Sequence, residues 1–324
     1  MVKLASAEMA EKKLATRAAF GATLAELAEE GVPVVAVDAD LTGSTTTKKF
    51  AAAAPENADK LFNCGIAEQN MIDVAAGLAL TGHVAYTGSF AVFGTGRAYD
   101  QIRNTVCYSN LDVKICPTHA GVSVGPDGGS HQMLEDVSLM RGLPNMRVLV
   151  PADYAAARAA IKLAAKTPGP VYVRMGRAAV PCVYDDDVEL EIGRAYVLRE
   201  GSDATVVACG VEIREALAAA DMLAEEGVSI EVIDAFSVKP LDEDTITASV
   251  AKTGCCVVAE EHSVHGGLGS AVAECLARKN PAPCEFVGVQ DRFGKSGEFE
   301  ELLGYFNLDA AAIVEAVKRA MGRK

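Results

Sequence analysis

The fold is set by the stretch Asn63-Cys64-Gly65-Ile66-Ala67-Glu68-Gln69-Asn70-Met71. Gly65 permits a sharp backbone turn, and apolar side chains recur at helical spacing over residues 68–81. Gly82 follows where a left-handed helix end is expected. The stretch therefore predicts a strand-turn-helix unit with Glu68 in the first helical turn. A carboxylate there has two open interpretations, a functional acid or a residue that the helix dipole simply favours.

Segments with strand and helix patterns alternate outward from this unit along almost the whole chain. The predicted strands cover residues 33–37, 84–87, 112–116, 146–150, 170–174, 204–208, 229–233, 255–259 and 285–289. The predicted helices cover residues 7–30, 68–81, 97–109, 132–142, 153–166, 211–227, 242–253, 268–279 and 309–321. This alternation indicates mostly parallel sheets with helices on both faces, which is the α/β fold class.

An acidic run without periodicity, Val183-Tyr184-Asp185-Asp186-Asp187-Val188-Glu189, interrupts the alternation. We interpret it as a solvated linker in preference to a calcium site, because charge runs are usually solvated. The sequence therefore predicts two three-layer α/β domains, residues 1–185 and residues 190–324, which suits a chain of 324 residues.

Composition excludes several classes of partner. The chain has 30 basic and 44 acidic residues, and the resulting net charge of −14 argues against nucleic acids and anionic membranes. Its nine cysteines lie mostly in apolar runs without zinc-ligand spacing, so we expect buried thiols in a reducing cytosol. The N-terminal segment lacks the apolar core of a signal peptide, and no apolar run reaches the ~20 residues that cross a bilayer. We expect a soluble, cytoplasmic protein.

The stretch THAGVSVGPDGGSHQ, residues 118–132, contains two of the five histidines, His119 and His131. It follows a predicted strand, where ligands collect in open α/β sheets. Its Pro-Asp-Gly-Gly turn should hold Asp127 and His131 close together at a loop tip. A lone loop histidine is usually just exposed, but two histidines that flank an aspartate in a glycine-rich loop favour a function.

Three further segments are ambiguous. Phe90 and Phe93 follow a predicted strand and suit either a core or a ring-binding pocket. Residues 38–44, DADLTGS, also follow a strand and suit an anion site or an ordinary loop equally well. The glycines of residues 266–269 match a dinucleotide loop poorly, and a tight turn is the better interpretation. The sequence shows no metal-ligand cluster, nucleophile elbow or Walker loop.

Taken together, these stretches resemble the pyrimidine-binding and C-terminal domains of the transketolase family over nearly the whole chain. GIAEQNM resembles the catalytic segment, and residues 118–132 resemble the family's TH…GxDGPTHQ loop, including the twelve-residue spacing of its histidines. RVLVPAD and EEHSVHGGLGSAVAE resemble further family segments. The GDG motif of the family's diphosphate-binding domain does not occur in the sequence. The resemblance implies the C-terminal subunit of a split transketolase, whose N-terminal subunit holds the diphosphate with Mg²⁺ or Ca²⁺.

The resemblance also implies how thiamine diphosphate is held. Glu68 matches the acid that bonds N1′ of the aminopyrimidine, and Phe90 and Phe93 match the aromatic pocket under that ring. The family's further aromatic position is Gly96 here, so Tyr99 is expected to complete the pocket.

Other matches concern the substrate and the subunit interface. His119 and His131 match histidines of the substrate channel, and they are the candidates for proton transfer. Asp127 matches the residue that recognises a substrate hydroxyl, although Pro126 and Gly129-Ser130 depart from the family pattern beside it. Positions that bind the substrate phosphate are matched by Arg17, Ser44 and Arg174, and a position at the cofactor interface between subunits is matched by Asp40.

The implied reaction is a reversible transfer of a two-carbon ketol unit from a ketose, expected to be a phosphate, to an aldose. The implied assembly contains two copies of each chain. Three alternatives stay open. They are the β subunit of a 2-oxo acid dehydrogenase, a fragment like deoxyxylulose-phosphate synthase, and a non-catalytic regulatory subunit that retains the fold.

Overall fold

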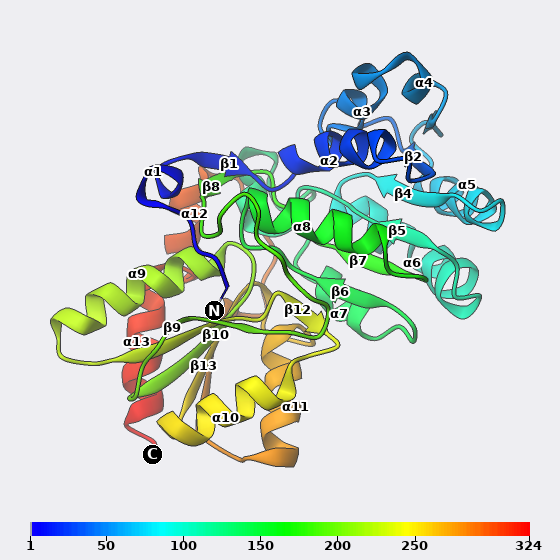
Figure 1. Ribbon diagram of the computed structural model, residues 1–324. Coiled ribbons are helices and arrows are strands. Elements are labelled where there is room, and N and C mark those ends of the chain that lie inside the picture. The colour runs from blue at the N-terminus through cyan, green and yellow to red at the C-terminus, as the bar shows by residue number, and fades with distance from the viewer. Residues whose placement is uncertain (1) are drawn as a thin grey trace.

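A computed structural model, which describes residues 2–324, shows two α/β domains packed against each other (Figure 1). The first sheet has seven strands in the order β12-β6-β7-β5-β4-β2-β3, and the second has five in the order β14-β13-β10-β11-β9. Neighbouring strands run parallel, except that β12 is antiparallel to β6 and β9 is antiparallel to β11. The predicted α/β class is confirmed.

The strands of the N-terminal half are β1 (Lys13–Ala15), β2 (Val34–Asp38), β3 (Leu61–Asn63), β4 (Val84–Gly88), β5 (Val113–Ile115), β6 (Arg147–Leu149), β7 (Val171–Val173) and β8 (Ala179–Pro181). Its helices are α1 (Ala7–Ala10), α2 (Ala18–Glu29), α3 (Thr47–Ala53), α4 (Pro55–Ala58), α5 (Glu68–Leu80), α6 (Tyr99–Gln101), α7 (Asp136–Arg141) and α8 (Tyr154–Ala165). Two π-helices, η1 (Val92–Arg97) and η2 (Ile102–Tyr108), and a 3₁₀ segment, η3 (Val122–Asp127), complete it.

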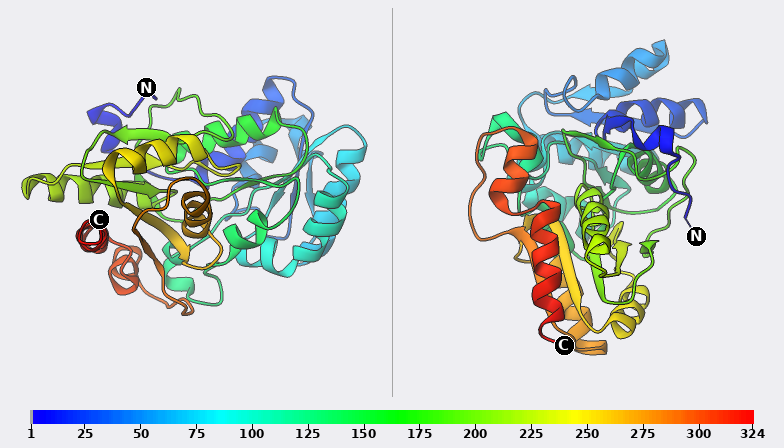
Figure 2. Two further views of the ribbon diagram at one scale, coloured as in Figure 1. Left: turned by 90° about the horizontal axis from the view of Figure 1, so that it is seen from below. Right: turned by 90° about the vertical axis from the view of Figure 1, so that its left-hand side faces the viewer.

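The strands of the C-terminal half are β9 (Tyr196–Arg199), β10 (Ala204–Ala208), β11 (Ile230–Asp234), β12 (Ser237–Lys239), β13 (Cys256–Ser263) and β14 (Cys284–Val289). Its helices are α9 (Glu212–Glu225), α10 (Glu243–Thr253), α11 (Leu268–Lys279), α12 (Phe299–Phe306) and α13 (Ala310–Met321). The long helices α9 and α13 lie side by side on one face of the second sheet, and α10 and α11 cover the other face (Figure 2).

Both faces of the first sheet are also covered, because each covering helix is apolar on one side. Phe20 and Leu24 of α2 and Ile161 of α8 belong to one buried cluster, and Met71 and Ile72 of α5 belong to the other. Each cluster continues into the second domain. The two domains therefore share continuous cores, which fixes the position of one domain on the other.

The predicted single helix over residues 7–30 is wrong. Residues 13–15 form β1, which pairs antiparallel with β8 through Leu14 opposite Val180. The Thr16 hydroxyl then accepts a hydrogen bond from the Gly176 backbone N–H at 2.7 Å. This pairing with a segment far along the chain overrides the local helical pattern, so Arg17 stands at the start of α2 rather than inside a helix.

The predicted helix over residues 97–109 is also irregular. The two π-helices η1 and η2 flank the short α6 there. A π-helix has a wider turn than an α-helix and is frequent at functional sites. In η1 this geometry places the Arg97 guanidinium over the ring of Phe93, 4.6 Å from its centroid.

The acidic run at residues 183–189 is tied to both domains. The carboxylate of Asp153, at the start of α8, accepts hydrogen bonds from the backbone N–H groups of Val183 and Tyr184 at 2.6 and 2.8 Å. The buried Tyr184 hydroxyl donates to Asp234 of the second domain at 2.6 Å. Asp186, Asp187 and Glu189 are exposed, as expected for a solvated charge run, while Val183 and Tyr184 hold the segment to both domains.

Candidate active site

Glu68 is the first residue of α5, and its side chain is 2% exposed. The turn before it uses Gly65 at φ 70°, a left-handed conformation that a side chain would disfavour. Arg97 Nη1 donates a hydrogen bond to Glu68 Oε2 at 2.8 Å, from a side chain that is 49% exposed. Because Arg97 also lies over Phe93, it connects the buried carboxylate to the aromatic residues after β4.

Phe90 and Phe93 lie with both predicted histidines in one cluster. Phe90 stacks on the His119 ring with a centroid distance of 3.7 Å, and Phe93 lies 6.2 Å from Phe90 at an interplanar angle of 13°. His131 approaches both phenylalanines edge-on, at 6.1 and 5.4 Å. The structure thus brings together predicted residues from segments that are distant in the sequence.

His119 is held in a constrained position. Its backbone φ is 61°, which is uncommon for a residue with a side chain, and the residue is 2% exposed. Its Nδ1 lies 2.7 Å from the Thr118 hydroxyl. Burial lowers the His119 pKa to about 3, helped by the nearby positive charges of Arg17 and Arg177 and by His131. His119 is therefore a neutral imidazole at physiological pH.

The loop after β2 is built around a buried aspartate. Asp38 Oδ2 accepts hydrogen bonds from the hydroxyls of Thr45 and Thr47 at 2.7 and 2.8 Å. These bonds fix the loop so that the Ser44 carbonyl oxygen accepts a hydrogen bond from Arg17 Nη1 at 2.8 Å. Of the predicted phosphate-binding residues, Arg17 and Ser44 are therefore in direct contact.

Arg174, the third residue matched to a phosphate-binding position, does not join them. The Arg174 side chain is 7% exposed, and its Nε donates to Asp136 Oδ2 at 2.7 Å. Its Nη2 donates to the carbonyl oxygen of Glu261 at 2.9 Å. Burial alone would lower the Arg174 pKa, but the Asp136 carboxylate outweighs burial and raises it above its usual value. Arg174 thus serves the domain interface.

Arg177, three residues further on, contacts the loop that carries both histidines. Its Nη1 donates to the carbonyl oxygen of Val124 at 3.1 Å. Burial lowers the Arg17 pKa, and the charge of Arg177 lowers it further. The charges of Arg17 and Arg177 both lower the His119 pKa. The sequence YVRMGR contains both arginines, and no local pattern in it distinguishes the buried one from the one that contacts the loop.

Arg174→Ala should destabilise the protein, because it leaves Asp136 buried without its cation. We expect a loss of about 3–5 kcal/mol of unfolding free energy, as for other broken buried ion pairs. The control is Arg158→Ala, whose partner Glu26 and own side chain are each 34% exposed. That pair should contribute less than about 1 kcal/mol. Urea unfolding of both variants measures the difference, and equal midpoints would contradict the structural role of Arg174.

The remaining predicted residues lie around the edge of the cluster or outside it. Asp127 is the exposed last residue of η3. Asp40 has φ 64° and exchanges hydrogen bonds with the Asn63 side chain at 3.1 and 3.2 Å, just before the turn to Glu68. Tyr99 packs against the core that includes α5, and the Arg97 guanidinium lies over the Phe93 ring.

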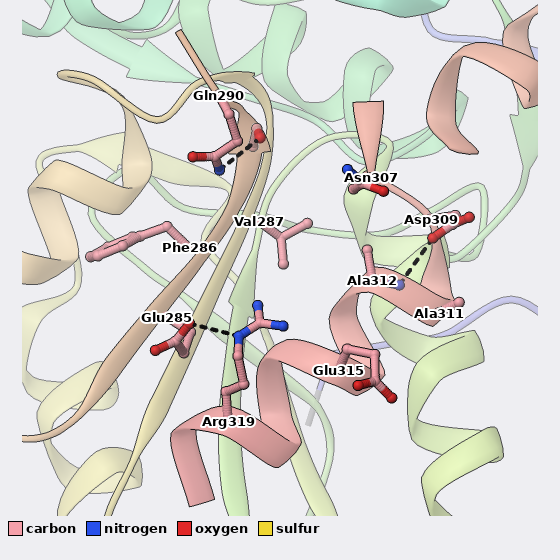
Figure 3. Close-up of a pocket in the computed structure, with 11 residues that line it drawn as sticks. Glu285, Phe286, Val287, Gln290, Asn307, Asp309, Ala311, Ala312, Glu315 and Arg319 are labelled. Carbon is pink, nitrogen blue, oxygen red and sulfur yellow. Dashed lines mark hydrogen bonds and ion pairs between the residues drawn. The ribbon is translucent and has the colours of Figure 1, made fainter. Parts of the chain in front are cut away.

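A large cavity, of about 580 Å³, lies elsewhere, between β14 and the start of α13 (Figure 3). Three of its four charged groups are already engaged with one another or with backbone, and the fourth, Glu315, lies 3.8 Å from Lys318. Arg319 Nε donates to Glu285 Oε2 at 3.1 Å, and Asp309 caps α13 by accepting from the Ala312 N–H at 3.0 Å (Figure 3). The cavity does not include Glu68 or the histidine cluster.

Among residues 2–324, no group of three or more histidine, cysteine, aspartate or glutamate side chains is arranged to hold a metal ion. No helix within the same residues is both long and apolar enough to span a membrane.

Comparison with known proteins agrees with the geometry. The pyrimidine-binding domain of transketolase matches residues 12–183, and the transketolase C-terminal domain matches residues 193–313. A putative transketolase C-terminal section from Methanocaldococcus jannaschii is 44% identical, over 95% of this chain and 96% of that protein. The 6-deoxy-6-sulfo-D-fructose transketolase subunit SqwH from a Clostridium species is 42% identical, over 93% of this chain and 92% of that protein. A solved split-gene transketolase, an inactive β4 tetramer, has a TM-score of 0.87 at 48% identity and covers 96% of this chain and 99% of that one.

Proposed function

This chain belongs to the transketolase family and corresponds to the C-terminal section of the split enzymes, and on that premise we propose that Glu68, Phe90, Phe93, His119 and His131 form its half of the active site. The proposed reaction is a reversible ketol transfer from a ketose to an aldose. The observation that carries the proposal is the buried Glu68 carboxylate, joined through Arg97 to the phenylalanine and histidine cluster.

The pyrimidine-binding domain implies thiamine diphosphate, and the residues present fit its aminopyrimidine end. Such a ring needs an apolar surface and a carboxyl group at the ring nitrogen. Phe90 and Phe93 are stacked with their planes nearly parallel, and the buried Glu68 is bonded to Arg97, which lies over the Phe93 ring. When bound, the cofactor supplies the carbanion that cleaves and forms the carbon–carbon bond. In our proposal Glu68 holds N1′ by a hydrogen bond, and Asp40 lies at the interface with the partner subunit.

The two histidines serve the substrate in different ways. His119, neutral and stacked on Phe90, can donate one hydrogen bond to a substrate oxygen and cannot carry a charge at neutral pH. His131 lies at the edge of the same cluster, and we assign it the proton transfer to and from the substrate hydroxyl. Asp127, exposed at the loop tip, would accept a hydrogen bond from a sugar hydroxyl.

Arg17 and Arg177 suit an anionic end group on the sugar. Arg17 donates to the Ser44 carbonyl oxygen, Arg177 donates to the Val124 carbonyl oxygen in the loop of the two histidines, and the charges of both lower the His119 pKa. Arginine binds phosphate and similar oxyanions through paired N–H groups, so a sugar phosphate is the proposed substrate class. The relative SqwH is named for a sulfonated sugar, which also carries an anionic end.

Arg177→Ala should raise the KM for a ketose phosphate by roughly tenfold or more, because a charge-assisted hydrogen bond contributes about 1.5–3 kcal/mol. The KM for the unphosphorylated ketose should stay within about twofold, since no such bond is lost. Steady-state ketol transfer by the two-subunit complex measures both constants. The control is Arg103→Ala, which removes an exposed arginine that contacts Asn104. Equal changes for both sugars would show that Arg177 does not bind the anion.

We further propose that a separate N-terminal subunit holds the diphosphate together with Mg²⁺ or Ca²⁺, and that two copies of each chain assemble. The family relatives that match this chain over almost their whole length support the split arrangement. The phenylalanine and histidine cluster and Glu68 would then face a site that the partner completes.

A further inference from the structure

The C-terminal domain presents buried polar side chains to the first domain at the carboxyl end of β13. Glu260, Glu261 and His262 lie there, and each is at most 3% exposed. β13 and β10 are neighbours at the point where the strand order reverses, which is where open α/β sheets usually bind ligands. Here the first domain occupies that position, since the Ser263 N–H donates to the Leu134 carbonyl oxygen at 2.8 Å.

Glu261 reaches across this boundary to the turn that follows His119. One of its carboxylate oxygens accepts a hydrogen bond from the Ser123 backbone N–H. Gly121 adopts φ 79°, and a methyl group on it would collide with the Glu261 carboxylate. Arg174 holds Glu261 from the other side, with Nη2 on its carbonyl oxygen at 2.9 Å and Nη1 3.9 Å from its carboxylate. The Glu261 carboxylate therefore lies in direct contact with the turn at Gly121 and Ser123.

The other end of the same loop is also fastened to the C-terminal domain. Gln132 donates from Nε2 to the Lys295 carbonyl oxygen at 2.9 Å and accepts at Oε1 from the Lys295 N–H at 2.8 Å. His119 and His131 thus stand on a loop that the second domain holds at two points. A residue at positive φ, such as His119, persists only where its surroundings hold it firmly.

We propose that Glu261 is a positioning residue for the active site, which supports the turn after His119 and so keeps the imidazole stacked on Phe90. The C-terminal domain would then act in catalysis through this contact. The catalytic part of the inference rests on the proposed function, whereas the contact and its effect on His119 can be tested without it.

The test is the titration of histidine side chains by NMR in the free full-length chain, with the His119 signal identified by its loss in His119→Asn. In the unmodified chain the His119 signal should not move between pH 8 and pH 5, because its pKa is about 3. In Glu261→Ala the ring should leave Phe90, enter water and titrate nearer the ordinary value of about 6.5. The direction of the change in the His119 pKa distinguishes movement of the ring from loss of charge, because loss of a carboxylate by itself can only lower a histidine pKa.

Two variants serve as matched controls. Glu260 is the neighbouring buried carboxylate, but its oxygens accept from the Leu268 and Gly269 N–H groups inside the second domain. Glu260→Ala should therefore leave the His119 signal unmoved. Glu261→Gln keeps an oxygen that can accept from the Ser123 N–H. In this variant the His119 signal should also stay unchanged between pH 8 and pH 5. If Glu261→Ala does not fold, Glu261→Asp takes its place, because its carboxylate is shorter by one methylene and lies further from the turn. It should raise the His119 pKa in the same way.

The inference would be overturned if the His119 signal did not move between pH 8 and pH 5 in either Glu261→Ala or Glu261→Asp. It would also be overturned if Glu260→Ala raised the His119 pKa as much as Glu261→Ala does. In the complex with the partner subunit, Glu261→Ala should lower kcat by roughly tenfold or more, with less than about a threefold change in the KM for the sugar phosphate. An unmodified complex without ketol transfer would refute the proposed function and leave the His119 titration result standing.

Discussion

Glu68→Gln should lower turnover by more than tenfold with partner subunit and cofactor both saturating, an increase of at least about 1.4 kcal/mol in the activation barrier. The physical reason is that a carboxyl group at N1′ can share a proton with the ring nitrogen, whereas an amide cannot. The glutamine has almost the same size, and the half-exposed Arg97 can be solvated after its partner is lost. Folding should therefore be preserved, and steady-state kinetics together with thermal unfolding would check both statements.

Asp73→Asn is the control for that experiment. Asp73 is exposed on the same helix, five residues after Glu68, so the variant removes one carboxylate from α5 without touching the cluster. It should retain full turnover. Near-normal turnover in Glu68→Gln would remove Glu68 from its proposed role, whatever the behaviour of the control.

The purified chain alone should show no measurable ketol transfer in the presence of thiamine diphosphate and Mg²⁺, at least roughly 10³-fold below the complex. The chain carries the pyrimidine-binding and C-terminal domains, and in our proposal the diphosphate and its metal are held by the partner. A related split-gene transketolase was solved as an inactive β4 tetramer.

Mixing with the N-terminal subunit should restore the reaction, and a chelator should abolish it again. The N-terminal subunit alone is the control and should also be inactive, because it lacks Glu68 and the phenylalanine and histidine cluster. Ketol transfer by either chain alone would contradict the division of the site between two subunits.

The sequence predicted the parts of the site that lie within continuous segments. Glu68 and the 118–132 loop lie in stretches whose spacing is independent of the rest of the chain, and the structure places them around one cluster. The α/β class and the membership of the transketolase family are both confirmed. The dehydrogenase and synthase alternatives are not favoured, because the relatives that match the whole chain are transketolase subunits.

The wrong predictions depended on contacts between distant residues. The resemblance matches Arg174 to a phosphate-binding position, and no local pattern shows that it meets Asp136, 38 positions away. The first helix was predicted too long because β1 is stabilised by β8, more than 160 residues further on. The contact of Arg97 with Phe93 and Glu68 depends on a π-helix, which a search for 3.6-residue periodicity cannot reveal.

The most direct test of the proposed role of Glu68 is a structure of the two-subunit complex with thiamine diphosphate. It would measure the distance from the Glu68 carboxyl group to N1′ of the aminopyrimidine. We predict a hydrogen bond of roughly 2.6–3.2 Å, with the ring against Phe90 and Phe93. Another acid at N1′, with Glu68 still paired to Arg97 and turned away from the ring, would contradict it.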